Sequence, residues 1–150
     1  MTKLKLRFEI LSRLRVLKPD IFTQAGFKLA EYLRPHSEEP IAIFRSFSDE
    51  IDTKLVVSHF PHVLLPDKDP YVYAQNILDA GVKYVYVPGL AFDDKCHRLG
   101  RGKGYYDRVI SLLRQTAHCP QLIGLCLKFQ LVASVPTEAH DQSVDKVISF

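Results

Sequence analysis

Apolar residues recur along the chain with two spacings, and these spacings predict alternating helices and strands. Helical spacing predicts a first amphipathic helix over residues 2–16, with an apolar stripe on Leu4, Phe8, Leu11 and Leu14. Pro19 suits the first turn of a second helix, which runs to Leu33. A further helix is expected over residues 105–114, directly after a glycine-rich loop.

Short apolar runs bounded by turn residues predict the strands. They cover residues 41–44, 62–65, 71–74, 84–87, 122–127 and 147–149, with short helical segments over 52–58 and 75–80. Strands that alternate with helices predict an α/β fold with three layers and a largely parallel sheet. No linker or repeat divides the 150 residues, so we expect a single domain over residues 1–150.

The most informative stretch is the run Arg-Leu-Gly-Arg-Gly-Lys-Gly-Tyr-Tyr-Asp-Arg at residues 98–108. Glycines in alternate positions let backbone N–H groups approach an anion, and the positive end of the following helix favours the same ligand. Lone glycine-rich loops are often simple turns, and this run is neither a Walker A loop nor the dinucleotide fingerprint. Four cations in this run, however, repel one another unless an anion or carboxylates lie among them. The run therefore predicts a polyphosphate site, with ATP as the expected ligand.

Three smaller groups of charged residues are also candidates for chemistry. Lys3 and Arg7 lie four apart on the first helix, so both side chains can point the same way, although a solvated helix face has the same pattern. Glu50 follows the first strand in a Ser-Asp-Glu loop, where a carboxylate is often only a cap. Asp107 and Asp141 suit Mg²⁺, but on the residues alone a helix-dipole partner and a turn residue explain them better. The histidines show no catalytic pairing.

Composition narrows the class of protein. The 47% of hydrophobic residues suits a globular core, and no run of about 18 apolar residues predicts a membrane span. A net charge of +3 is too small for a nucleic-acid footprint. The three cysteines have no metal-ligand spacing, and the first residues lack the apolar core of a signal peptide. We expect reduced thiols, a cytoplasmic location, a monomer, and neither nucleic acid nor membrane as a partner.

Residues 87–93 read Val-Pro-Gly-Leu-Ala-Phe-Asp, and together with residues 98–108 they closely resemble the 5-formyltetrahydrofolate cyclo-ligase (methenyltetrahydrofolate synthetase) family. Residues 3–7 resemble its amino-terminal Lys-x-x-Leu-Arg, and residues 50–53 its Glu-x-Asp/Glu-Thr. Gln130 and residues 136–141 resemble its closing Gln and Pro-x-Glu-x-His-Asp. The resemblance covers nearly the whole chain. It implies the three-layer fold shared with ribose-5-phosphate isomerase and CoA transferases.

The resemblance implies a ligase of one-carbon metabolism that uses ATP and Mg²⁺. The small-molecule substrate 5-formyltetrahydrofolate would become 5,10-methenyltetrahydrofolate, with ADP and phosphate released. ATP contacts are implied for Lys3, Arg7, Arg98, Gly100, Arg101, Gly102, Lys103, Gly104, Tyr105 and Tyr106. Catalytic roles are implied for Lys103, Arg101 and Tyr105, and folate contacts for Glu50, Arg101 and Tyr105. The resemblance also implies that Mg²⁺ is bound by Asp107 and Asp141.

Two positions depart from the family pattern. Cys96 stands where the family usually has glycine, and the stretch from Pro66 to Lys83 is short. That stretch lacks the Ile-Pro-Glu/Gln-Pro segment that lies near the folate in most relatives. The alternative hypothesis is therefore an ATP-binding paralogue that has lost part of the folate site. A third hypothesis, a sugar-phosphate isomerase of similar fold, lacks the acid/base carboxylate motif it would need.

Overall fold

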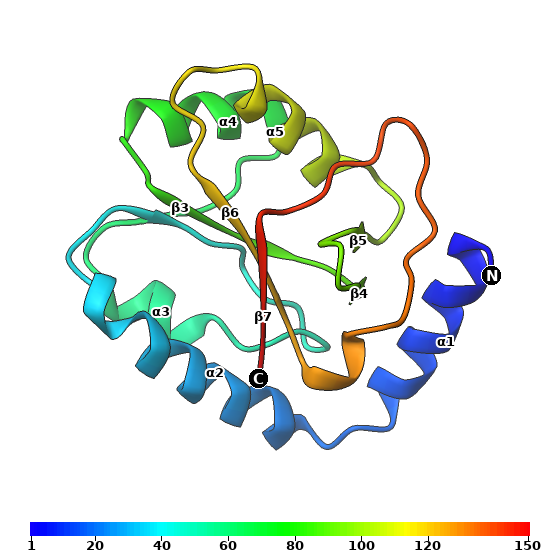
Figure 1. Cartoon of the computed structure of the whole chain (residues 1–150). Coiled ribbons are helices and arrows are strands. Elements are labelled where there is room, and N and C mark those ends of the chain that lie inside the picture. Colours follow the sequence, from blue (N-terminus) through cyan, green and yellow to red (C-terminus); the bar gives the residue numbers. More distant parts are fainter.

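The computed structural model describes all 150 residues and has a parallel five-stranded sheet between two layers of helices (Figure 1). The strand order is β2-β1-β3-β6-β7, formed by β1 (Ile41–Ala42), β2 (Val63–Leu64), β3 (Tyr84–Pro88), β6 (Gln121–Cys126) and β7 (Lys146–Ser149). A separate antiparallel hairpin pairs β4 (Ala91–Phe92) with β5 (Arg98–Leu99). The predicted α/β fold with a parallel sheet is confirmed, whereas the hydrophobic pattern does not predict the hairpin.

Helices cover both faces of the sheet (Figure 1). One layer holds α1 (Lys3–Arg15), α2 (Pro19–Leu33) and α3 (Lys54–His59), and the other holds α4 (Pro70–Asp79) and α5 (Tyr105–Arg114). Two single 3₁₀ turns, η1 (Arg34–His36) and η2 (Lys128–Gln130), complete the elements. Two apolar clusters, one on each face, form the core. The bounds of α2 and α5 agree with those predicted.

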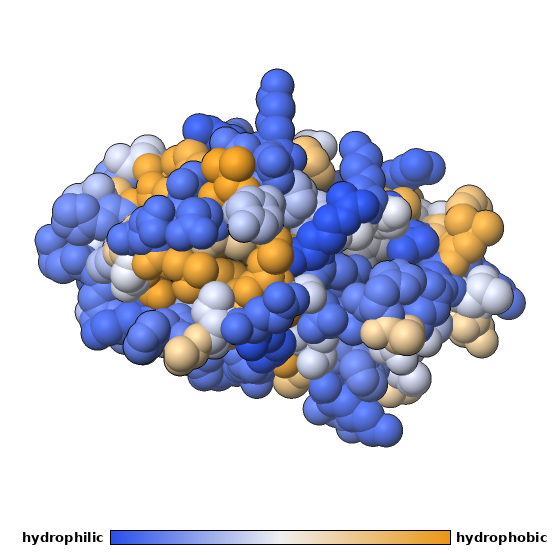
Figure 2. All heavy atoms as spheres, turned by 90° about the horizontal axis from the view of Figure 1, so that it is seen from above, coloured by the Kyte–Doolittle hydropathy of each residue, from blue (hydrophilic) through white to orange (hydrophobic).

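Apolar side chains gather on one part of the surface. Viewed from the side of α4 and α5, apolar side chains gather over these two helices (Figure 2). The other end of this view is largely hydrophilic (Figure 2), whereas the start of α1 exposes the apolar side chains of Met1, Leu4 and Phe8. None of the helices combines the length and apolar character needed to cross a bilayer.

The first helix packs through a different face from the one predicted. Its buried residues are Leu6, Ile10 and Leu14. Leu4 and Phe8 instead are 76% and 72% exposed, whereas Leu11 is partly buried against the core, so the predicted stripe is wrong at its first two members. Positions three and four apart share a side of a helix, so Lys3 and Arg7 lie next to the buried positions. Burial of this face therefore turns both cations inward.

The strand predicted over residues 71–74 is wrong, because these residues belong to α4. The Asp69 carboxylate accepts a hydrogen bond from the Tyr71 amide at 2.8 Å, and Pro70 occupies the first turn. These two start signals, together with the burial of Tyr73 and Ile77 against the sheet, outweigh the strand preference of Tyr-Val-Tyr. The segment predicted as a separate helical turn over residues 75–80 is the second half of the same helix.

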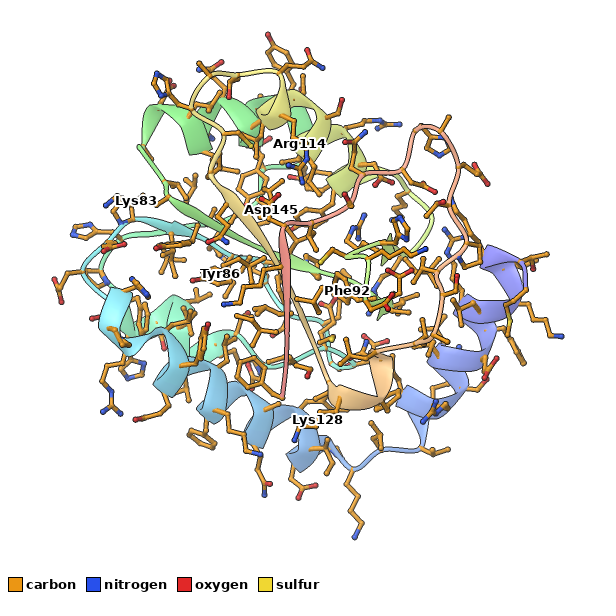
Figure 3. All side chains as sticks on the ribbon, in the orientation of Figure 1. Lys83, Tyr86, Phe92, Arg114, Lys128 and Asp145 are labelled. Atoms are coloured by element: carbon orange, nitrogen blue, oxygen red, sulfur yellow. The ribbon has the colours of Figure 1, made fainter.

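The hairpin is fixed to the sheet by Phe92, which is fully buried beside the end of β3 (Figure 3). A Cβ atom on Gly124 of β6 would lie 2.4 Å from the Phe92 ring, and one on Gly89 would lie 2.7 Å from it. Only glycine at both positions allows this contact. The hairpin, and the glycine loop that follows it, are thus held at the carboxyl ends of β3 and β6.

Cys96 lies in the hairpin turn with φ = 62°, a left-handed conformation that glycine adopts without strain. Cys96→Gly is expected to raise the free energy of unfolding by about 0.5–1 kcal/mol, because relief of left-handed strain exceeds the extra chain entropy that glycine loses. Urea denaturation measures the change. Cys119→Gly, at a half-buried cysteine of ordinary backbone, is the control and should lose stability. A loss of stability in Cys96→Gly would contradict this account of the turn.

Candidate active site

A cavity of about 1400 Å³ opens at the carboxyl ends of β1, β2 and β3, the edge where parallel α/β sheets bind ligands. Its walls are the 44–50 loop after β1, the 66–71 segment after β2, the glycine loop, and the first turns of α1 and α5. Eight Lys or Arg residues and five Asp or Glu residues line it. This excess of three positive charges equals the net charge of the whole chain, +3. The cavity thus suits an anionic ligand.

The first helix docks onto the glycine loop through the two predicted cations. Arg7 Nε donates to the Gly100 carbonyl at 2.9 Å, across 93 positions of sequence. Lys3 Nζ lies 2.5 Å from Asp141 Oδ2, in the segment before β7. The structure therefore brings the helix, the loop and the carboxyl-terminal carboxylate to one place, while the ATP contacts of Lys3 and Arg7 stay a prediction.

The backbone of the loop depends on glycine at two positions. Gly102 and Gly104 have φ of 105° and 72°, where side-chain-bearing residues are strained. Gly104 is also the N-cap of α5, and no side chain caps that helix, so amides of its first turn remain available to an anion. Lys103 and Arg108 line the same cavity and form no ion pair within the chain.

Arg98 supports the loop from beneath. Its side chain is 5% exposed, donates through Nη1 to the Pro88 carbonyl at 3.0 Å, and stacks over the Tyr106 ring at 5.6 Å. A Cβ on Gly100 would lie 3.0 Å from the guanidinium, so loop and arginine are packed together. Burial lowers the pKa of Arg98, which Asp107, 3.7 Å away, opposes. A phosphate contact by Arg98 stays a prediction, and this burial does not favour it.

Arg101 bridges the cavity to the 44–50 loop. It donates to both carboxylate oxygens of Asp49, at 2.7 and 3.2 Å, and its guanidinium stacks on the exposed Phe47 ring at 5.0 Å. Its Nη2 also lies 3.6 Å from Glu50 Oε2. Sequence reasoning missed Asp49, since only the fold joins positions 52 residues apart. Glu50 and Arg101, both predicted to contact folate, therefore stand face to face.

The Glu50 carboxylate is nearly buried, with its side chain 11% exposed. Oε1 accepts a hydrogen bond from the Phe47 amide at 2.7 Å. Burial raises the pKa of Glu50, although the Phe47 amide and Arg101 act in the opposite direction. Its second oxygen lies 3.6 Å from Arg101 Nη2, so this carboxylate caps the loop through one oxygen and faces Arg101 through the other.

The two tyrosines of the loop have different environments. The Tyr105 hydroxyl donates to the Asp67 carbonyl on the opposite wall at 2.5 Å, and burial raises its pKa to about 12. The Tyr106 hydroxyl is buried with no hydrogen-bond partner, and burial raises its pKa well above the usual value. Both phenols therefore stay protonated at neutral pH. The Tyr106 hydroxyl is thus an unpartnered donor buried inside the protein, whereas the Tyr105 hydroxyl is already bonded to the opposite wall.

Asp107 and Asp141 fit the needs of Mg²⁺, which binds one or two carboxylates and completes its shell with phosphate oxygens and water. Both line the cavity, and Asp107 Oδ1 accepts from the Gln142 amide at 3.0 Å, next to Asp141 in the chain. Asp107 Oδ2 has no partner, and Asp141 uses Oδ2 for Lys3 and the Glu138 amide. Asp141 Oδ1 lies 3.5 Å from His140 Nε2, so only Asp107 keeps an oxygen without a partner. No group of three or more His, Cys, Asp or Glu side chains that could hold a metal ion forms here, so an ion would need ligand oxygens.

The fold and the site together define an α/β protein with a cationic cavity at the carboxyl ends of its strands, and comparison with known proteins identifies its family. The family model of the 5-formyltetrahydrofolate cyclo-ligase family matches residues 61–149. The mouse 5-formyltetrahydrofolate cyclo-ligase is 26% identical over 184 residues, which cover 95% of this chain and 91% of the relative. The Saccharomyces cerevisiae enzyme of the same name is 34% identical over 125 residues, covering 81% of this chain and 54% of the relative.

Among solved structures, a 5,10-methenyltetrahydrofolate synthetase from Mycoplasma pneumoniae superposes with a TM-score of 0.73 at 22% identity, covering 99% of this chain and 98% of that one. This likeness confirms the fold. The chain belongs to the 5-formyltetrahydrofolate cyclo-ligase family. The mouse alignment is longer than the 150 residues of this chain, so the mouse relative carries additional residues.

Proposed function

We propose that this protein is an ATP- and Mg²⁺-dependent 5-formyltetrahydrofolate cyclo-ligase, which forms 5,10-methenyltetrahydrofolate, ADP and phosphate. The observation that carries the proposal is the meeting of the glycine loop with Arg7 of α1 at one end of the cavity, and with Glu50 through Arg101 at the other. The first end suits a polyphosphate and the second a pterin ring. A reaction that joins the two ligands needs both in one cavity.

The loop side of the cavity would hold ATP. Backbone amides of the loop and of the first turn of α5 would bind phosphate oxygens, and Lys3, Arg7 and Lys103 would offset their charge. Lys103, free of any ion pair, is the cation best suited to follow the γ-phosphoryl group as it moves. The catalytic assignments of Lys103, Arg101 and Tyr105 rest on this arrangement and on the family.

The opposite wall would orient the folate. Glu50 Oε2 would accept N–H bonds from the pterin ring, and Arg101 and the Tyr105 ring would contact the folate beside it. The γ-phosphoryl group moves to the formyl oxygen, which becomes a good leaving group. The folate N10 then attacks the formyl carbon, loses its proton, and expels phosphate. The chain contributes positioning and charge, so the absence of a histidine pair is consistent with the chemistry.

Asp107 would hold Mg²⁺ through its unpartnered Oδ2, and Asp141 through Oδ1, which faces His140. When bound, this ion supplies charge neutralisation for the phosphate oxygens. The two carboxylates stand on the α5 and carboxyl-terminal sides of the loop, and Lys3 and Arg98 hold them in place.

The direct test is the growth of methenyl-folate absorbance in the near ultraviolet when purified protein is given 5-formyltetrahydrofolate, ATP and Mg²⁺. We expect the absorbance to grow when ATP is present and to stay constant when ATP is omitted. Folded protein that gives no signal at saturating substrates would overturn the proposal. We also expect the enzyme to be soluble, cytoplasmic and monomeric. Size-exclusion chromatography with light scattering measures the oligomeric state.

The alternative function, an ATP-binding paralogue with an incomplete folate site, is favoured by one observation. The 66–71 wall passes directly into α4, so the cavity has no further segment between β2 and β3 to cover a folate. Calorimetric titration separates the two functions. Binding of both ATP and 5-formyltetrahydrofolate supports the enzyme, whereas binding of ATP alone supports the paralogue.

A further inference from the structure

The hairpin turn over residues 93–97 is organised by one buried carboxylate. Asp93 has a side chain that is 2% exposed, and it belongs to none of the groups placed in the active site. Oδ1 accepts from the amides of Lys95 and His97, each at 3.0 Å. Oδ2 accepts from the His97 ring at 3.0 Å and from the Val135 amide at 2.9 Å. One side chain therefore folds the turn and also reaches a segment 42 residues away.

Asp93 is an acceptor in all four bonds, so it functions as a carboxylate. Burial alone would raise its pKa, but the hydrogen bonds from Val135 and His97 outweigh burial and hold the pKa below the usual value. The bond to the Val135 amide is buried. A buried amide with no acceptor would cost roughly 1–3 kcal/mol, so the Val135 bond is a strong constraint on the chain.

The segment over residues 135–144 is anchored to this turn at both of its ends. Its first residue bonds to Asp93 Oδ2, and its last, Val144, donates to the Cys96 carbonyl at 3.0 Å. Cys96 holds its left-handed conformation inside the turn that Asp93 closes. Asp141 lies between the two anchors, and the neighbouring Gln142 amide bonds to Asp107. Further along, Asp145 pairs with Arg114 of α5 at 3.1 Å (Figure 3).

We propose that Asp93 is a positioning residue for the candidate metal site: through the 93–97 turn it sets where the Asp141 carboxylate stands relative to Asp107. The same turn leads through β5 into the glycine loop, so Asp93 sits at the junction of the phosphate loop and the carboxyl-terminal carboxylate. The inference rests on the proposed function for the identity of the ion, and its structural part stands on the hydrogen bonds alone.

Asp93→Asn is the variant that tests the proposal. An amide offers one acceptor oxygen in place of two, so it can keep the turn or the Val135 bond but not both. We expect amide hydrogen exchange at Val135, Val144 and Gln142 to become at least about tenfold faster. We also expect the Mg²⁺ concentration for half-maximal ATP binding, measured by calorimetry without folate, to rise about tenfold. The dissociation constant for ATP without Mg²⁺ should stay within about twofold of the parent value. A general loss of structure would weaken ATP binding with and without Mg²⁺ alike.

His97→Ala is the matched control. It removes only the ring contact with Asp93 and leaves the Val135 bond in place. Exchange at Gln142 and the Mg²⁺ dependence should stay at parent values in this variant. Faster exchange confined to the 93–97 turn of Asp93→Asn, with Gln142 and the Mg²⁺ dependence unchanged, would overturn the proposal.

A measurement on the parent chain keeps the proposal testable where the variant fails to fold. Coupling is reciprocal, so addition of Mg²⁺ to the ATP-bound parent should slow exchange at the Val135 amide by about threefold or more. Unchanged exchange at Val135 overturns the proposal. Absence of folate turnover overturns the proposed function instead, and leaves both exchange results standing.

Discussion

Lys103→Ala is expected to lower kcat about 10²- to 10³-fold while the KM for ATP changes only a few-fold. The physical reason is that Lys103 forms no ion pair in the chain and faces the cavity from the tip of the glycine loop. A cation that meets charge developing on the transferring phosphoryl group stabilises the transition state more than the bound ATP, and loss of one such contact costs about 2–4 kcal/mol of barrier. Steady-state kinetics with varied ATP measure both constants.

Lys95→Ala is the control for this effect. Lys95 is an exposed lysine of the neighbouring hairpin turn, and its side chain lies outside the cavity lining. Parent-like kcat is expected in this variant. Parent-like kcat in Lys103→Ala would show that Lys103 is a solvated loop charge with no part in the reaction.

Asp107→Asn is expected to raise the Mg²⁺ concentration for half-maximal rate about tenfold or more, and Asp141→Asn by a smaller factor. Asp107 follows the glycine loop directly, in the first turn of α5, whereas Asp141 already pairs with Lys3. Excess Mg²⁺ should restore part of the rate in both variants, because an amide keeps one weak oxygen ligand. Rate measurements over a Mg²⁺ titration at saturating ATP and folate give these constants.

Glu138→Gln is the matched control for the pair. Glu138 is an exposed carboxylate three positions before Asp141, lies 3.6 Å from the same Lys3, and is absent from the cavity lining. Its variant should keep the parent Mg²⁺ dependence. An unchanged dependence in Asp141→Asn would assign Asp141 to the turn and leave the metal role to Asp107 alone.

Local signals predicted most of the fold. The hydrophobic period and the proline at the first turn were sufficient for α2, and the end of the glycine loop was sufficient for α5. The period could not choose between the two apolar faces of α1, since that choice depends on how the helix docks through Arg7 on Gly100. It also favoured a strand over residues 71–74, where the Asp69–Pro70 start signal determines a helix. Caps outweigh strand propensity there because they act on the first turn of the helix.

In the candidate site, only residues that can be recognised by their type and spacing in the sequence could be predicted. The glycine loop, Lys3, Arg7, Glu50 and Asp107 all line one cavity. The sequence did not reveal that Arg98 is buried beneath the loop, because residue type and spacing do not distinguish a buried arginine from an exposed one. Asp49 and Asp93 were missed for a related reason. Each carboxylate acts through a partner 42 or 52 residues away, and only the fold brings them together.

The most direct measurement uses 5-formyltetrahydrofolate labelled with ¹⁸O in the formyl group. If the γ-phosphoryl group is transferred to the formyl oxygen before N10 closes the ring, that oxygen leaves with the phosphate. Mass spectrometry should then find one ¹⁸O atom in each phosphate released, in step with methenyl-folate formation and with unlabelled ADP. Methenyl-folate formed alongside unlabelled phosphate would contradict the account, as would ATP hydrolysis that proceeds without consumption of the folate.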